Sequence, residues 1–120
     1  MVRSIFALAA VLSVATASLA KDLVTPAVYV GFKTTVICKL LNITSAPVTA
    51  QVQLVEVNGK VIWDSFPQTV AAEGTLEIGD SYPQTKVFCR FVNASLSKFR
   101  GALVEASNID ATDIVVVPAQ

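Results

Sequence analysis

The 120-residue sequence contains no histidine. This absence excludes Ser-His-Asp and Cys-His catalysis, together with zinc or copper sites built on imidazole. The nine Asp and Glu residues are scattered along the chain, whereas a glycosidase needs two carboxylates that face each other across a cleft. We therefore expect no enzymatic activity, no metal and no cofactor.

Charged residues are also few, and the nine Lys and Arg are balanced by nine Asp and Glu, so neither sign is in excess. A chain without a positive surplus has no electrostatic reason to bind nucleic acid or an anionic membrane. An uninterrupted apolar run of roughly 20 residues, which a membrane-spanning helix would need, is missing as well. These absences leave a small neutral protein whose function rests on its shape and its surface.

The longest mostly apolar stretch, residues 5–17, follows Arg3 and precedes small residues at 18–20. This order of a positive charge, an apolar run and small residues is typical of a secretory signal peptide. We predict cleavage after Ala20, which leaves residues 21–120 as a single domain without a membrane attachment. The protein is then expected to be secreted or periplasmic.

Strand signals dominate residues 21–120. In 47–57, apolar and polar residues alternate, which indicates a strand with one buried face. Asn58-Gly59 follows, and this pair is preferred in the two-residue type I′ turn, so we predict a hairpin with 60–63. Further strands are predicted at 27–30, 34–43, 74–78, 85–93, 99–106 and 113–117. Seven or eight short strands without an amphipathic helix predict an all-β, immunoglobulin-like antiparallel β-sandwich.

The chain has two cysteines, Cys38 and Cys89, and each lies within a predicted strand. Residues two apart in a strand share a face, so Cys38 shares its face with Val36, and Cys89 shares its face with Phe91. Both sulfur atoms should therefore point into the core. After export to an oxidising compartment, we expect them to form one buried disulfide.

The chain at this point resembles the immunoglobulin-like superfold, in which an early and a late core strand are often joined by such a bridge. The segments 38–44, 58–59, 89–91 and 99–103 also resemble a group of small exported bacterial proteins of uncharacterised function. The likeness covers most of residues 21–120. It implies the fold and the export, and it implies no activity.

If both cysteines point inward, apolar residues at neighbouring positions must point outward. The candidate partner contacts are Ile37 and Leu41 on one strand, and Phe88 and Val92 on the other. One interpretation is that loops or the C-terminal tail cover these side chains. The other is that they form an exposed apolar patch to which a protein binds.

Two N-x-[ST] sequons occur, at Asn42 and Asn93. Each Asn could carry a glycan in a eukaryotic secretory pathway. The structural alternative is that each Asn ends a strand, where its side chain can cap a turn.

The leading functional hypothesis is a non-catalytic binding or interaction module, secreted or periplasmic, whose partner is an unknown protein or a cell-envelope component. The alternative is a structural accessory or subunit of a cell-envelope assembly, for which the apolar strand at 113–117 would be the docking element. That strand offers an unpaired backbone to a partner if it lies at a sheet edge. We expect a monomer or a weak oligomer.

Overall fold

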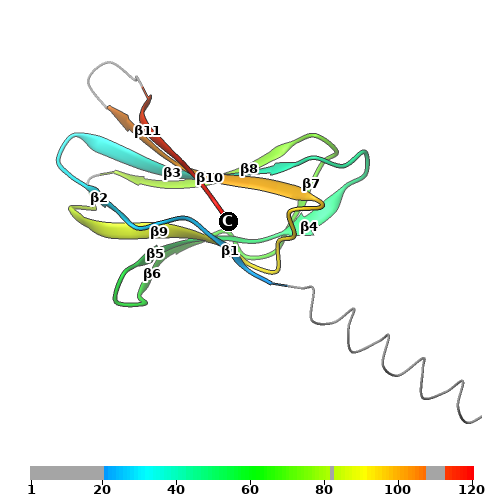
Figure 1. Cartoon of the computed structure of the whole chain (residues 1–120), viewed down its shortest axis with the longest axis horizontal. Helices are drawn as coiled ribbons and strands as arrows, with labels where there is room; N and C mark the ends of the chain where they lie inside the picture. Colours follow the sequence, from blue (N-terminus) through cyan, green and yellow to red (C-terminus); the bar gives the residue numbers. More distant parts are fainter. Residues whose placement is uncertain (1–20, 82, 108–112) are drawn as a thin grey trace, which may run out of the picture.

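The structure is a computed structural model that describes residues 21–81, 83–107 and 113–120 (Figure 1). The predicted signal peptide, 1–20, lies outside the described residues. No helix long and apolar enough to cross a membrane occurs in the described ranges.

The described residues form eleven strands and no helix, which confirms an all-β chain and corrects the expected count of seven or eight. The strands are β1 (Leu23–Val24), β2 (Val28–Val30), β3 (Thr34–Asn42), β4 (Val48–Ala50), β5 (Val52–Glu56), β6 (Val61–Asp64), β7 (Gln68–Val70), β8 (Thr75–Ser81), β9 (Thr85–Phe91), β10 (Phe99–Ser107) and β11 (Asp113–Pro118). The two that the sequence did not indicate, β1 and β7, are short.

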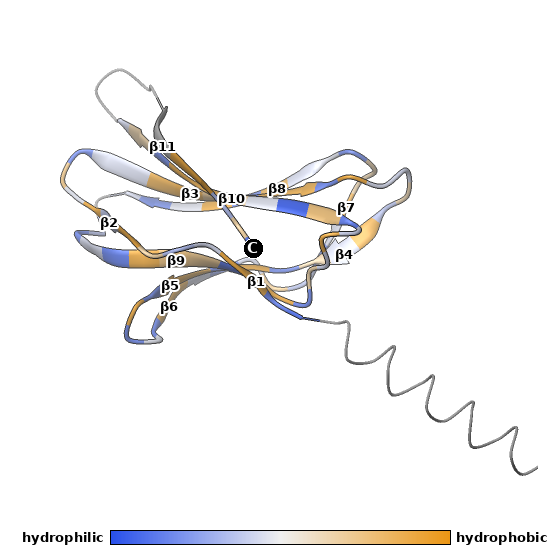
Figure 2. Ribbon diagram, in the orientation of Figure 1, coloured by the Kyte–Doolittle hydropathy of each residue, from blue (hydrophilic) through white to orange (hydrophobic). Residues whose placement is uncertain are grey.

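The strands form two larger antiparallel sheets that lie as two layers (Figure 1). The first, here called the β9 sheet, has the order β1-β9-β5-β6, with β2 also paired to β9. The second, the β3 sheet, has the order β11-β10-β3-β8. Strands β4 and β7 form a small third sheet. The arrangement is sandwich-like, with apolar and polar residues alternating along the ribbon (Figure 2).

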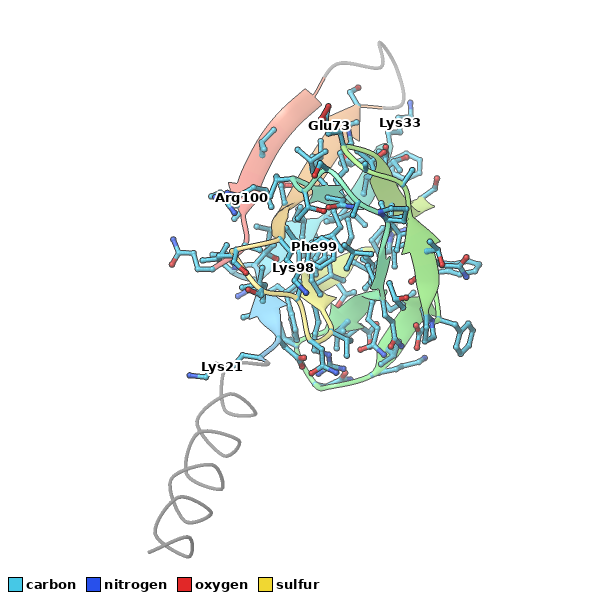
Figure 3. The ribbon with its side chains drawn as sticks, turned by 90° about the vertical axis from the view of Figure 1, so that its right-hand side faces the viewer. Lys21, Lys33, Glu73, Lys98, Phe99 and Arg100 are labelled. Carbon is cyan, nitrogen blue, oxygen red and sulfur yellow. A yellow bond between two sulfur atoms is a disulfide. The ribbon has the colours of Figure 1, made fainter. Side chains whose placement is uncertain are left out.

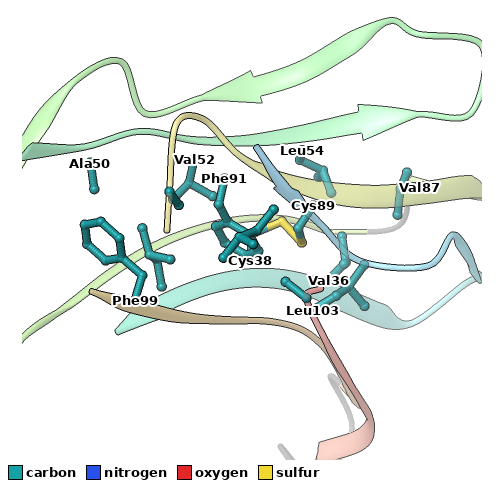
Figure 4. Close-up of a cluster of buried hydrophobic side chains, with 14 of the residues drawn as sticks. Val36, Cys38, Ala50, Val52, Leu54, Val87, Cys89, Phe91, Phe99 and Leu103 are labelled. Atoms are coloured by element: carbon teal, nitrogen blue, oxygen red, sulfur yellow. A yellow bond between two sulfur atoms is a disulfide. The ribbon is translucent and has the colours of Figure 1, made fainter. Parts of the chain in front are cut away.

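The core lies between the layers, and the disulfide crosses it (Figure 4). Cys38 belongs to β3 and Cys89 to β9, their Cα atoms are 5.7 Å apart, and both side chains are fully buried. The predicted inward direction of both cysteines is therefore confirmed. At one end of the core, Phe99 is buried between the exposed residues Lys98 and Arg100 (Figure 3).

The segment 47–57, predicted as one strand, is divided at Gln51 into β4 and β5. β4 pairs with β7, whereas β5 pairs with β6 and β9. The inward apolar positions continue through the break, since Ala50 and Val52 are both buried. A pattern of alternating hydrophobicity records the face of each residue and not its partner strand, so it could not reveal the division.

The hairpin between β5 and β6 is present, but its turn differs from the predicted type I′. The Glu56 N–H donates to Lys60 O (2.8 Å), and the Gly59 N–H donates to Glu56 O (2.8 Å), so the loop has three residues. A type I′ turn needs positive φ at both central residues. Of the Asn58-Gly59 pair, only Gly59 has a positive φ, 96°. Gly59 therefore takes the left-handed position that closes a three-residue hairpin loop.

One side of the sandwich is closed by the residues after β11. The Ala119 N–H still bonds to the β10 residue Gly101 (2.8 Å to its O atom). Gln120 then pairs with Val24 of β1 through two backbone hydrogen bonds, of 3.0 and 3.2 Å. This segment links the two sheets, and it places residue 120 between the layers at the front of Figure 1.

Candidate interaction surfaces

The structure places the four predicted partner contacts on two opposite outer faces. Ile37 and Leu41 lie on β3, on the outer side of the β3 sheet. Phe88 lies on β9, on the outer side of the β9 sheet, and Val92 directly follows that strand. Leu41 is exposed (38%), while Ile37, Phe88 and Val92 are half-buried. The four residues therefore do not form a single patch.

The outer face of the β9 sheet carries an apolar row of three side chains. Val55 is paired with Phe88 on one side and with Val61 on the other, and paired residues point to the same face. Val55 is fully buried, although it points away from the core, and Val61 is exposed at 39%. We call Val55, Val61 and Phe88 the outer row. Its central residue, Val55, is therefore as inaccessible to solvent as a residue of the core.

A ladder of polar side chains flanks the outer row. The Arg90 Nε donates to Gln53 Oε1 (2.8 Å), and the Gln53 Nε2 donates to Asp64 Oδ2 (3.0 Å). The Gln51 Nε2 donates to the other carboxylate oxygen, Oδ1, of Asp64 (3.0 Å). We call Gln51, Gln53, Asp64 and Arg90 the polar ladder. Each of these side chains is held in place by its neighbours, so the ladder is organised before any partner arrives.

The carboxylate of Asp64 is the centre of the ladder. Partial desolvation acts to raise its pKa, but hydrogen bonds from Gln51, Gln53 and the Phe66 backbone and the charge of Arg90 outweigh it, so the pKa lies below its usual value. Because the folded pKa is depressed, this group stabilises the fold above the usual Asp range. That contribution is lost as the pH falls through the lowered pKa.

A hollow of about 160 Å³ lies at the end of the ladder. It is lined by Thr49, Ala50, Gln51, Pro67, Val92 and Asn93. Ligand and substrate pockets are typically about 300–1,000 Å³. The hollow therefore suits a single side chain of a partner better than a small-molecule substrate. Val92, predicted as a contact, is one of its walls.

The loop after β6 presents an aromatic ring beside this surface. Phe66 is 65% exposed and has a positive φ of 54°, which is uncommon for a bulky residue. The Phe66 N–H donates to Asp64 Oδ1 (2.8 Å), and the Ser65 Oγ donates to Phe66 O (2.9 Å). Ser65 also accepts the Val52 N–H (2.9 Å). The ladder therefore fixes the strained backbone that displays this ring.

The two sequon asparagines differ completely. Asn42 is fully buried, and its Nδ2 donates to Ala46 O (2.9 Å), Val70 O (3.2 Å) and Ala71 O (3.2 Å). The side chain therefore caps a turn, as the structural alternative predicted, and its nitrogen is inaccessible in the folded chain. Asn93 is exposed, in a turn with a positive φ of 52°.

In the described ranges, no group of three or more Cys, Asp or Glu side chains is placed to hold a metal ion. Comparisons of the chain with protein-family models, curated proteins and solved structures found no match.

Proposed function

We propose that this chain is an exported, non-catalytic interaction module with an immunoglobulin-like core, and that it binds a protein partner through the outer face of the β9 sheet. A buried disulfide suits an oxidising compartment, which supports export. The bridge joins an early and a late strand in opposite layers, which supports the immunoglobulin-like assignment.

The observation that carries this proposal is the outer row beside the polar ladder. Protein interfaces combine an apolar centre with a polar rim and are enriched in aromatic residues and arginine. Val61 and the half-buried Phe88 of the outer row supply the apolar centre, the ladder with Arg90 supplies the rim, and Phe66 supplies an exposed aromatic ring. The side chains of the rim are fixed by hydrogen bonds, so little of their entropy would be lost on binding. For Phe66, hydrogen bonds fix the backbone that carries the ring.

The test compares one valine and one leucine whose side chains are equally exposed. Val61 is 39% exposed on the outer row, and Leu41 is 38% exposed on the opposite outer face. Wild type, Val61→Asp and Leu41→Asp are used as bait in native envelope extract. We expect wild type and Leu41→Asp to recover the same specific partner, and Val61→Asp to lose it. Equal recovery by all three baits, or no specific partner for wild type, would refute the proposal.

Phe88 is less suitable as a test position because it is half-buried. Replacing it by Ser removes part of a packed aromatic side chain, and we expect a stability loss of about 1.5 kcal/mol. If that variant lost binding, a lost contact with the partner could not be distinguished from a loss of folded protein.

The second candidate function, a structural accessory docked through its C-terminal strand, is favoured by one observation. Strand β11 lies at the edge of the β3 sheet, as that hypothesis requires, and Val116 is 59% exposed. Its register with β10 shifts between Glu105 and Ala106, and Pro118 ends it. Bulges and prolines limit strand addition at a sheet edge, so the regular part available to a partner is short.

A further inference from the structure

The other edge of the β3 sheet is formed by β8, and it is longer and more regular than β11. All seven residues of β8 are paired to β3 without a register shift, from Thr75 opposite Leu41 to Ser81 opposite Thr35. Exposed edges are usually blocked by prolines, bulges or lysines. The strand contains none of these. Of its two acids, Glu77 lies opposite Lys39 of β3. Asp80 is an inward-pointing charge, which is a protective feature, but it lies next to the last residue of the strand and away from its centre.

The backbone groups of β8 that face away from β3 can be identified. The Asn42 N–H donates to Gly74 O (2.9 Å), which makes this pair a hydrogen-bonded one. Hydrogen-bonded and non-hydrogen-bonded pairs alternate along an antiparallel ladder. Ile78 therefore bonds to β3, whereas Glu77 and Gly79 direct their N–H and C=O groups to the free edge.

Thr75 and Ser81 face the free edge by the same alternation. Within the described part of the chain, no backbone hydrogen bond engages Thr75, Glu77 or Gly79. An edge of this kind is a template to which another strand can add.

The order of residues in β8 makes it complementary to itself. In an antiparallel pair centred on Ile78, Glu77 lies opposite Gly79 of the second copy, and Thr75 lies opposite Ser81. Every one of these residues is an edge-facing one, so each pair exchanges two hydrogen bonds. Moving the centre by one position to Glu77 would place two glutamates directly opposite each other, which is unfavourable. Moving the centre the other way, to Gly79, would place Thr75 opposite Pro83, which lies beyond β8 and has no N–H. The register centred on Ile78 avoids both problems.

We propose that β8 pairs with β8 of a second copy of this chain, antiparallel and about a two-fold axis at Ile78. The pairing joins the two β3 sheets into one continuous sheet, and it is isologous, as in most dimers. It leaves the outer rows of both β9 sheets free. The dimer would therefore present two partner-binding faces, and it stands or falls independently of the function proposed above.

The first experiment measures the mass of the protein, isolated after expression of the full chain, by sedimentation velocity across a wide range of concentration. We expect a monomer–dimer equilibrium. The variant Glu77→Pro removes an edge-facing N–H and leaves the bonds to β3 intact. Two hydrogen bonds are then lost per dimer, which should weaken dimerisation roughly thirtyfold. Glu77→Thr keeps the N–H and removes the charge, and it should dimerise at least as well as wild type.

The second experiment is amide hydrogen exchange on the wild type, which does not depend on any variant folding. The amides of Glu77 and Gly79 should be protected in concentrated samples and exchange rapidly in dilute ones. The amide of Ile78, bonded to β3, should be protected in both. A monomer at every concentration would overturn the proposal, as would a dimer in which Glu77 and Gly79 exchange rapidly or which Glu77→Pro leaves intact. Neither result would affect the outcome of the Val61→Asp experiment.

Discussion

Asn42 is the most sharply testable residue in the fold. Its side chain is fully buried and makes five hydrogen bonds: three from its Nδ2 to backbone carbonyls, and two accepted by its Oδ1 from the N–H and the hydroxyl of Thr44 (2.9 and 2.7 Å). These bonds join the end of β3 to the turn at Ala46 and to the end of β7, at Val70 and the following Ala71. One side chain thus fixes three separate segments.

The expected cost of Asn42→Ala follows from those bonds. A hydrogen bond contributes about 1 kcal/mol net, but a buried group left without a partner costs about 1–3 kcal/mol. After this change the Thr44 hydroxyl still bonds to Ala46 O, and Ala71 O still accepts the Gly74 N–H. The Thr44 N–H and Val70 O lose the bond that the Asn42 side chain supplied. Water can reach the part-buried groups, so we expect a loss of about 3 kcal/mol and not the sum of every bond.

Asn42→Asp tests the same geometry by its pH dependence. A carboxylate at this position would face the carbonyls of Ala46, Val70 and Ala71, so its folded pKa would be raised above the unfolded value. The variant should approach wild-type stability below the usual Asp pKa of about 3.9 and lose it as the pH rises through the folded pKa. Asn93→Asp, at an exposed Asn, is the matched control. Its pH dependence should be much smaller, because only solvent-screened repulsion from Asp22, whose carboxylate accepts the residue 93 N–H (2.8 Å), would arise.

Urea unfolding, followed by far-UV circular dichroism, measures the free energy of unfolding for all four proteins at several pH values. A loss below about 1 kcal/mol for Asn42→Ala would show that the buried amide does not hold these three segments together. The same conclusion would follow if Asn42→Asp and Asn93→Asp depended on pH alike.

Three further predictions concern the core. Gly101→Ala would place a Cβ atom 2.6 Å from the ring of the fully buried Phe91, so the free energy of unfolding should fall by roughly 2 kcal/mol; a neutral result in urea would show that the ring can move. Replacing both Cys38 and Cys89 by Ala opens a loop with a sequence separation of 51, and urea unfolding should show a loss of about 4 kcal/mol with the β-rich spectrum retained. Burial raises the pKa of Glu105 above its usual 4.5. The free energy of unfolding of the wild type should therefore fall as the pH rises from 4.5 through the folded pKa. Glu105→Gln should remove this slope from melts at several pH values, and an unchanged slope would contradict the assignment.

The strands that could be predicted from the sequence are those long enough to show a period. β3 and β10 were predicted to within about a residue, because each is nine residues long. Burial alternates along β3 from Val36 to Asn42, whereas Leu103, Val104 and Glu105 of β10 are buried in succession. β1, with two residues, and β7, with three, are too short to produce such a signal. They are strands because a neighbour supplies their hydrogen bonds, and that neighbour comes from a distant part of the chain.

For the candidate surface, the sequence predicted which side chains point outward, but it did not predict which of them lie together. Counting residues from each cysteine correctly placed Ile37 and Phe88 on outer faces. A disulfide between opposite layers makes those two outward directions opposite, so the residues could not share a patch. The polar ladder was not predicted, because it depends on which strands are neighbours. Gln53 and Arg90 are distant in the chain and meet only across the pairing of β5 with β9.

The hairpin of β5 and β6 has two irregularities that compensate each other before the ladder is reached. A two-residue turn at Asn58-Gly59 would pair 57 with 60 and, four residues further along, Gln53 with Asp64. The observed three-residue loop joins Glu56 to Lys60, which is one residue out of that register. The register shift between Leu54 and Val55 restores it, so Gln53 does lie opposite Asp64. The centre of the ladder is thus the same for either turn.

Between the two irregularities, however, the turn decides which residue of β6 lies opposite Val55. With the two-residue turn, Val55 would lie opposite Ile62, and this larger side chain would join the outer row. With the observed loop, Val55 lies opposite Val61, and Ile62 packs against the core. The loop therefore assigns the larger residue to the interior and leaves the smaller one, 39% exposed, at the surface. The exposure of Val61, on which the proposed binding face depends, is a consequence of a turn that the Asn-Gly pair alone does not specify.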